Sequence, residues 1–272
     1  FCEKKEDVDY ILYPRLAAVS EAAWSTPIAK RWDRFLTMLD DYRERWRMKG
    51  IRSSMSEYNV KHEVVPNFGD LKMMLSCIRP DVEIRYTTDG SEPHEYSMLY
   101  RRPLIIKQSQ TVKCATFKDG KRVSQILEIP VQVSGTTGCN VLRSNSVERR
   151  LVNGVRGSLK NTDGEWASWG KNDSIALTFD VGARKRMGVV SLGYLNDFGL
   201  GIHKPQKVEV WLSDNDVHYW KATEQTFDSD EVFVEGRFTK EMKFAFEDVA
   251  RYVRIIMKGA GKCSGYHVRP GL

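Results

Sequence analysis

Acidic side chains are the first candidates for chemistry in this 272-residue chain, and their spacing matches none of the usual catalytic arrangements. The acidic clusters are Asp40-Asp41, Asp214 with Asp216, and Asp228 with Asp230 and Glu231. The first cluster falls on the polar side of an expected helix. The other two lie in polar turns, where aspartate favours hydrogen bonds to the local backbone. We therefore interpret all three as solvated groups and predict no catalytic residue in the chain.

Histidine and cysteine patterns favour neither a metal site nor a nucleophile. The histidines, which are His62, His94, His203, His218 and His267, show no HxxxH or HxxE spacing, and no serine lies in an elbow motif. The cysteines are Cys2, Cys77, Cys114, Cys139 and Cys263, an odd number at irregular separations. This pattern fits neither a disulfide framework nor a CxxC site. We predict mostly free or buried thiols, no bound metal and no cofactor.

Aromatic residues in the last half of the chain form a candidate sugar-binding set. Sugar rings present C–H faces that pack on indole or phenol rings, while amides and other polar groups bind the hydroxyls. Trp166 and Trp169 occur in the polar stretch GEWASWGKND. Tyr194, Asn196 and Phe198 lead into the glycine-rich stretch DFGLGIH. The predicted sugar-binding residues are Trp166, Trp169, Tyr194, Asn196, Phe198 and His203. The alternative, that each tryptophan fills the core at the end of a sandwich, stays open.

The region between Tyr10 and Gly50 has the period of helices. One helix is expected to carry its apolar face on Leu12, Leu16, Val19 and Ala23, and to stop before Pro27. A second should begin at Thr26-Pro27 and end at Gly50, with the buried stripe Trp32, Phe35, Leu36, Leu39 and Trp46. Two helices cannot bury such broad faces against each other alone. They must therefore dock on a larger body or on the next domain, and we predict that they dock on the middle sandwich.

The rest of the chain has the period of β-strands. Alternating apolar residues and the turn pairs Asp89-Gly90 and Asp119-Gly120 indicate a small β-sandwich over about 57–134. A larger sandwich is expected after the polar linker SGTTG. Its strand patterns are Ile175, Leu177, Phe179 and Val181; Val208, Val210 and Leu212; and Val253, Ile255 and Met257.

Charge and hydropathy exclude two classes of partner. The net charge is +6, but the basic residues are scattered, and the runs Arg149-Arg150 and Arg184-Lys185-Arg186 lack interleaved aromatics. We therefore predict no nucleic-acid partner. No apolar run approaches the roughly 20 residues that cross a bilayer, so no membrane span is expected. The opening residues have no signal-peptide pattern, and we expect that a preceding part of the protein has been removed.

Three motif groups resemble the carboxyl-terminal part of glycoside hydrolase family 20 enzymes, the β-N-acetylhexosaminidases. YILYPRLAAVSEAAWS (10–25) with KRWDRFL (30–36) resembles the closing helices of their catalytic barrel. IRYTTDGSEP (84–93) with TVKCATFKDGKRVS (111–124) is similar to the chitobiase/β-hexosaminidase C-terminal domain, a fibronectin-like sandwich. LVNGVRGS (151–158), EWASW (165–169) and PQKVEVWLSDND (205–216) resemble the coagulation factor 5/8 type C, or discoidin, fold of carbohydrate-binding module family 32. Many Bacteroidota hexosaminidases have this order of domains.

The resemblance implies a mainly β chain with three parts. Residues 1–52 would be a helical remnant of a (β/α)8 barrel, 53–134 a fibronectin/immunoglobulin-like sandwich, and 139–272 a discoidin-like jelly-roll sandwich. It also implies a periplasmic, secreted or cell-surface location. The expected partners are the catalytic barrel of the same parent chain and glycans with N-acetylhexosamine or galactose. The family's catalytic Asp-Glu pair lies upstream of the matched helices and has no counterpart here.

Two departures from the family bear on the third part. The usual acidic residue of an LVDG-like motif is Asn153, so the structural calcium that the resemblance allows has no support. The sequence also stops before the usual aromatic final strand, which we expect to leave one edge open. The leading hypothesis is a noncatalytic accessory region that binds carbohydrate or supports the barrel of a parent that removes terminal non-reducing N-acetylhexosamine residues. Purely structural domains and a discoidin-type adhesion or protein-binding module are the alternatives.

Overall fold

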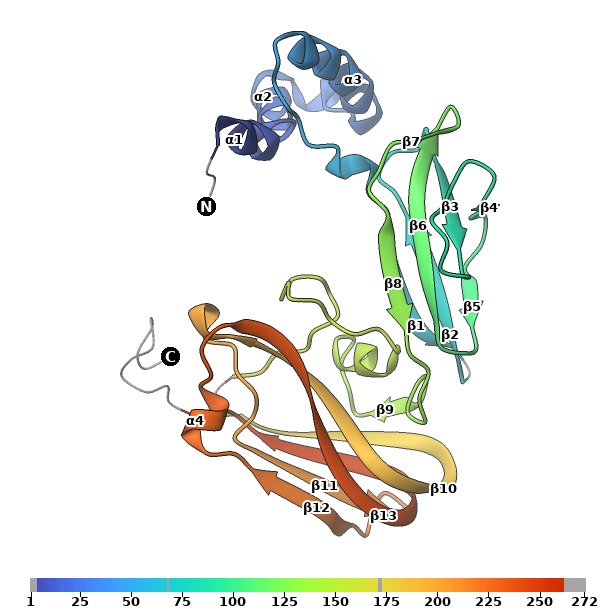
Figure 1. Ribbon diagram of the computed structural model, residues 1–272, viewed down its shortest axis with the longest axis vertical. Coiled ribbons are helices and arrows are strands. Elements are labelled where there is room, and N and C mark those ends of the chain that lie inside the picture. The colour runs from blue at the N-terminus through green and yellow to red at the C-terminus, as the bar shows by residue number, and fades with distance from the viewer. Residues whose placement is uncertain (1–3, 68, 171–172, 262–272) are drawn as a thin grey trace. The chain divides into compact units, whose positions relative to one another are not determined.

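The protein is described by a computed structural model that covers residues 4–67, 69–170 and 173–261, and these residues are mainly β (Figure 1). The helices are α1 (Lys5–Leu12), α2 (Arg15–Trp24), α3 (Trp32–Met48) and α4 (Ser229–Val232), with short 3-10 turns at Pro27–Ala29, Ser56–Tyr58, Glu148–Val152 and Phe198–Leu200. The strands are β1 (Lys61–Asn67), β2 (Asp70–Ser76), β3 (Glu83–Thr87), β4 (Met98–Leu99), β5 (Leu104–Ile106), β6 (Gln110–Lys118), β7 (Lys121–Arg122), β8 (Leu127–Val131), β9 (Asn140–Leu142), β10 (Ser174–Asp197), β11 (Lys207–Ser213), β12 (Trp220–Thr226) and β13 (Arg237–Lys258).

Two compact units interleave along the sequence. The first consists of Phe1–Lys61, Leu75–Arg101 and Lys113–Leu127, and the second of His62–Met74, Arg102–Val112 and Glu128–Leu272. Several antiparallel sheets account for the β structure. The domain limits predicted at 1–52, 53–134 and 139–272 stay predictions.

The first predicted helix is in fact two helices, α1 and α2, which are interrupted at Tyr13-Pro14. Proline has no N–H to donate within a helix, so a proline inside the pattern ends the preceding one. Neither helix has a buried residue, and the predicted apolar face is exposed at Leu12, Leu16 and Val19. Thr26 and Pro27 begin a 3-10 turn rather than the next helix.

Helix α3 carries the centre of the predicted buried stripe and ends as expected, but Trp32 in its first turn is 55% exposed and the prediction was wrong there. Phe35, Leu36 and Leu39 are buried. Gly50 has a φ of +71° and donates its N–H to the carbonyl of Arg47, while Ile51 N donates to Trp46 O. This left-handed glycine just after the last turn satisfies carbonyls that the helix leaves free.

A buried arginine fixes α3 to the segment between β2 and β3 in the first unit. The side chain of Arg79 is 2% exposed. It donates to Leu36 O at 3.0 Å, to the Asp40 carboxylate at 2.6 Å, and to both Asp81 oxygens at 2.8 and 2.7 Å. Asp40 therefore does not belong to a purely solvated face, as the sequence suggested. It anchors the helix, and Tyr58 donates a further hydrogen bond to it.

The predicted hairpins of the first unit are formed. Strands β4, β3, β6 and β7 are neighbours in that order, and Tyr86 pairs with Cys114, which is fully buried. Asp119 and Gly120 both have positive φ, 51° and 74°, in the turn between β6 and β7. A two-residue turn of this kind matches the right-handed twist of the strands that it joins.

The second unit contains a five-stranded antiparallel sheet with the order β12-β11-β13-β10-β9. Strands β10 and β13 pair over nearly their whole length, and Figure 1 shows them curving together. Their register shifts between Asp180 and Lys185 and again between Met187 and Val189. Except for Val181, the residues of the three predicted alternating patterns belong to one core, in which Val208, Val210 and Leu212 are fully buried.

Three cysteines are described, and all are free: Cys77, Cys114 and Cys139. Burial raises the pKa of the Cys139 thiol to about 12, so this thiol stays protonated at neutral pH. Cys2 and Cys263 lie outside the described residues. Among the helices that the structure describes, none has the length and apolar character needed to span a bilayer.

Replacement of Arg79 by methionine tests the anchor of α3. The change keeps the apolar stem and removes the hydrogen bonds that Arg79 donates to the Leu36 carbonyl and to the carboxylates of Asp40 and Asp81, which keep Tyr58 and Lys118 as donors. The carboxylates are 37% and 38% exposed, so we expect a loss of about 2 kcal/mol, less than for a fully buried pair. Urea unfolding and hydrogen exchange of the α3 amides measure it. The control R47M removes an exposed ion pair, which solvent screens, and should leave the urea midpoint close to that of the wild type. Equal midpoints for the two variants would contradict the assignment.

Acid should weaken the same anchor. The hydrogen bond from Arg79, helped by Lys118, holds the pKa of the Asp81 carboxyl well below its usual range. A carboxyl with a lowered folded-state pKa stabilises the protein above its unfolded-state pKa of about 3.9, and this contribution disappears as the pH falls through the folded-state value. We expect the stability difference between the wild type and D81N to shrink as the pH falls below about 4. Denaturant midpoints across this range measure the difference, which should not stay constant.

Candidate functional site

The loop that carries the two candidate tryptophans starts from a close approach of two backbones. Gly154 has a φ of +73°, and its carbonyl accepts the N–H of Gln132 at 2.8 Å. A Cβ at this position would lie 2.8 Å from the Gln132 carbonyl oxygen. The glycine of the LVNGV motif is therefore required by the pairing of residues 153–155 with the end of β8.

Asp163 holds the loop closed upon itself. One carboxylate oxygen accepts the Ser158 N–H at 2.6 Å, and the other accepts the Glu165 N–H at 2.9 Å. Arg150 donates to Gly164 O at 2.9 Å from the preceding 3-10 turn. Because these bonds join backbone groups across the loop, residues 158–165 have a defined conformation without a regular strand.

Trp166 packs inside the loop. Its indole N–H donates to Ser158 O at 2.9 Å, and the ring lies against Gly157. A Cβ on Gly157 would lie 2.2 Å from the ring. One polar group and part of one face of Trp166 are therefore used within the protein, which agrees with the alternative of a packing residue more than with a free sugar platform.

Trp169 has a different environment. The residue is 37% exposed, and it lines the same cavity as Trp166. Of the two tryptophans in this stretch, Trp169 is the more exposed.

The cavity has a volume of about 1010 Å³ and lies along the inner face of the large sheet. Its lining includes Trp166, Trp169, Tyr194 and His203 from the predicted set. Aliphatic and aromatic side chains of β10 and β13, among them Leu177, Phe179 and Ile255, form much of the rest. Lys185 and Arg186 contribute positive charge. A mostly apolar cavity with a few polar groups is typical of a binding site.

The other members of the predicted set have structural surroundings. Asn196 is buried and donates its two amide hydrogens to Val234 O and Gly236 O, each at 2.9 Å. Its side chain therefore holds the chain after α4 and is not part of the cavity lining. Phe198 is also absent from that lining, and its ring meets His203 edge to face at 5.9 Å.

His203 and Tyr194 are partly enclosed by rings. His203 also meets Phe233 edge to face, at 5.0 Å. Tyr194 meets Phe238 in the same manner at 6.4 Å, and burial raises the pKa of the Tyr194 hydroxyl. Packing against these rings thus fixes the positions of both side chains, and both residues also line the cavity.

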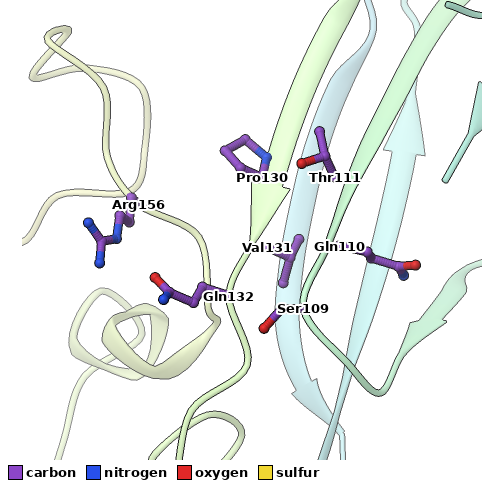
Figure 2. A pocket seen from close by; sticks show the side chains of 7 residues that line it. All are labelled: Ser109, Gln110, Thr111, Pro130, Val131, Gln132 and Arg156. Carbon is purple, nitrogen blue, oxygen red and sulfur yellow. The ribbon is translucent and has the colours of Figure 1, made fainter. Parts of the chain in front are cut away.

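A second pocket, of about 430 Å³, is shallower (Figure 2). In Figure 2, Gln132 extends toward Arg156, whereas Gln110 points away. Arg156 already pairs with Glu241 at 3.0 Å. The lining consists of Ser109, Gln110, Thr111, Pro130, Val131, Gln132 and Arg156, with no aromatic ring for a sugar to stack on. The larger cavity is therefore the candidate site.

The acidic clusters have local roles in the described structure. Asp216 accepts from Arg143 at 2.7 Å and from the hydroxyl of Tyr219. Asp228 and Glu231 form a reciprocal cap at the start of α4. Within residues 4–67, 69–170 and 173–261, no group of three or more His, Cys, Asp or Glu side chains could hold a metal ion.

Sequence reasoning missed the polar residues that shape the loop. Asp163 and Glu165 lie among glycines and tryptophans in a stretch that looks like an ordinary polar turn. The nearest signal was the substitution of asparagine for the usual acid at position 153. Asn153 donates to the Glu165 carboxylate at 2.7 Å, so an acid at 153 would place two carboxylates together.

Comparisons with known proteins support a relationship to glycan-degrading enzymes. Residues 73–129 match the family described as Fn3 associated. A curated β-hexosaminidase of Porphyromonas gingivalis is 31% identical over 131 residues, which cover 47% of this chain and 17% of that protein. The chain therefore spans less than a fifth of the length of this relative.

Two solved structures overlap with part of the chain. One is CpGH89CBM32-6 of Clostridium perfringens, with 19% identity, 47% of this chain and 86% of that chain covered, and a TM-score of 0.29. The other is the C-terminal domain of a chitobiase from Bacteroides fragilis, with 13% identity, 46% and 84% covered, and the same TM-score. TM-scores this low do not define a common fold. With the matched Fn3 associated region and the curated relative, the chain is similar to the C-terminal portion of a hexosaminidase-like protein.

Proposed function

We propose that this chain is a noncatalytic, carbohydrate-binding accessory region of a β-N-acetylhexosaminidase, and that residues 139–272 form a discoidin-like sandwich. The observation that carries the proposal is Trp169, a 37% exposed indole that lines an apolar cavity beside a closed loop. A sugar ring would stack its C–H face on this indole. The expected ligands are glycans with terminal N-acetylhexosamine or galactose.

The remaining lining suits a weak and selective site. Tyr194 and His203 are held by neighbouring rings and can bind sugar hydroxyls. The aliphatic lining suits the methyl group of an acetamido substituent, which avoids water. One stacked ring contributes on the order of 1 kcal/mol beyond the area that it buries, so the affinity should be low.

A structural role is the second candidate, and Trp166 favours it. Its N–H is bonded within the loop and its ring packs on Gly157. If Trp169 does no more than cover the core, the region supports the neighbouring parts of the parent protein and binds no glycan.

The parent protein is proposed to act outside the cytoplasm, in the periplasm or at the cell surface, where it would remove terminal non-reducing N-acetylhexosamine. Its catalytic (β/α)8 barrel would be the partner of helices α1 and α2, whose apolar side chains are exposed, including Trp24 at 88%. Large apolar side chains grouped on helices are typical of surfaces that contact another part of a protein.

Substitution of Trp169 by alanine tests the sugar site. We expect the affinity for N-acetylglucosamine or galactose to fall by about fivefold, since about 1 kcal/mol of stacking is lost. Retention on sugar matrices and calorimetric titration measure it, and thermal unfolding shows whether the fold is kept. The control is W220A, because Trp220 has a similar exposure of 36% and does not line the cavity. Unfolding of W169A, or retention equal to wild type, would favour the structural role.

Enzyme assays test the noncatalytic part of the proposal. We expect no turnover of an aryl N-acetyl-β-hexosaminide above the buffer rate, because the family's Asp-Glu motif is absent from the sequence, and Asp216, Asp228 and Glu231 are engaged in an ion pair and a helix cap. Release of the chromophore measures the rate. Turnover that a single substitution within this chain abolishes would refute the prediction.

A further inference from the structure

Glu165, the residue directly before Trp166, has a carboxylate that is nearly removed from water. Its side chain is 9% exposed. One oxygen accepts the side-chain N–H of Asn153 at 2.7 Å, and the other lies 3.4 Å from His62 Nε2 on β1. A buried carboxylate is expensive unless donors or positive charge surround it. The position of this group is therefore determined by Asn153 and His62.

Asn153 is itself fixed. It is 1% exposed, and its carbonyl oxygen accepts the Val155 N–H at 2.9 Å while its NH2 group faces Glu165. Gly154 next to it accepts from Gln132 N. Since both ends of the amide are engaged, it cannot turn without losing one hydrogen bond.

His62 completes the cluster from a separate strand. Its Nε2 atom is buried and has no hydrogen bond, although it lies within ion-pair distance of Glu165. The two findings agree if the 3.4 Å contact is too long or poorly aligned for a hydrogen bond. The imidazole thus contacts the carboxylate while Asn153 holds it.

We propose that Glu165 is the positioning residue of the candidate glycan-binding loop, held by a hydrogen bond from Asn153 and by contact with His62 on strand β1. The inference rests on the proposed function of Trp169. Asp163 fixes the Glu165 backbone and Asn153 fixes the Glu165 side chain. Residues 163–166 are therefore held through both the backbone and the side chain of Glu165. Release of the carboxylate would loosen the backbone at Trp166 and, three residues further on, at Trp169.

The cluster explains why position 153 carries an amide. Aspartate has the same shape and would keep the bond from Val155 N, but it would place an oxygen where the NH2 group now donates to Glu165. Two carboxylates at this distance repel each other. N153D therefore replaces only the NH2 group of Asn153 by an oxygen and disrupts its hydrogen bond to Glu165.

A rescue experiment tests the assignment. N153D should weaken binding to an N-acetylglucosamine matrix by about fivefold and speed hydrogen exchange at residues 158–166 by a similar factor, because a buried hydrogen bond becomes a repulsion. The double variant N153D/E165Q restores a donor–acceptor pair with its direction reversed. We expect affinity and exchange within about twofold of wild type.

Two control variants make the same types of substitution, asparagine to aspartate and glutamate to glutamine, at other positions. N59D adds a charge at an exposed asparagine, and E63Q removes one from an exposed glutamate next to His62 on β1; both should behave as wild type. If wild type itself does not bind the matrix, the proposed function fails, while exchange still reports on the loop. Exchange in N153D equal to wild type, or a double variant no better than N153D, would overturn the positioning role. A global loss of protection in N153D that the double variant does not reverse would overturn it as well.

Discussion

The antiparallel pairing of β10 with β13 supports the described part of the large sheet. Strand β9 joins through β10, β11 joins through β13, and β12 reaches the sheet through β11. The two register shifts bend the long strands, and this pair of strands both builds the sheet and lines the cavity. A bulge increases local twist and redirects side chains. Strand pairing thus produces the part of the cavity lining that the sheet supplies. The loop that carries Trp166 and Trp169 adds these two rings to the lining and is held by other interactions.

The loop and the helices are held by a different kind of interaction. Where no ladder exists, charged side chains hold the segment: Asp163 in the loop and Arg79 beside α3 bond to backbone groups, and Glu165 accepts from the Asn153 side chain. Charge-assisted hydrogen bonds are stronger and more directional than contacts between apolar groups. They therefore give a precise geometry to segments that have little core of their own.

Strands and turns were largely predictable from sequence, because alternation and Asp-Gly pairs are local signals. The patterns at Ile175–Val181 and Val208–Leu212, the hairpin at Asp119-Gly120 and the end of α3 at Gly50 all form as expected. The break at Tyr13-Pro14 also has a local signal, the proline, but the regular apolar spacing before and after it predicted one continuous helix. Arg79 could not be identified, since its partner Asp40 is 39 residues away in the sequence. The hydrogen bonds of Asn196 could not be identified for a related reason: an asparagine near glycines has the same local pattern whether it faces solvent or bonds to main-chain carbonyls.

The contact of Gly157 with Trp166 has a consequence for how this sequence can vary. Any side chain at 157 would occupy space that the indole fills, and a smaller residue at 166 would leave a void and an unbonded Ser158 carbonyl. Neither position can change alone without a loss, so the two should vary together among homologues. A homologue with a bulky residue at 157 should lack tryptophan at 166 and should close this loop in another way.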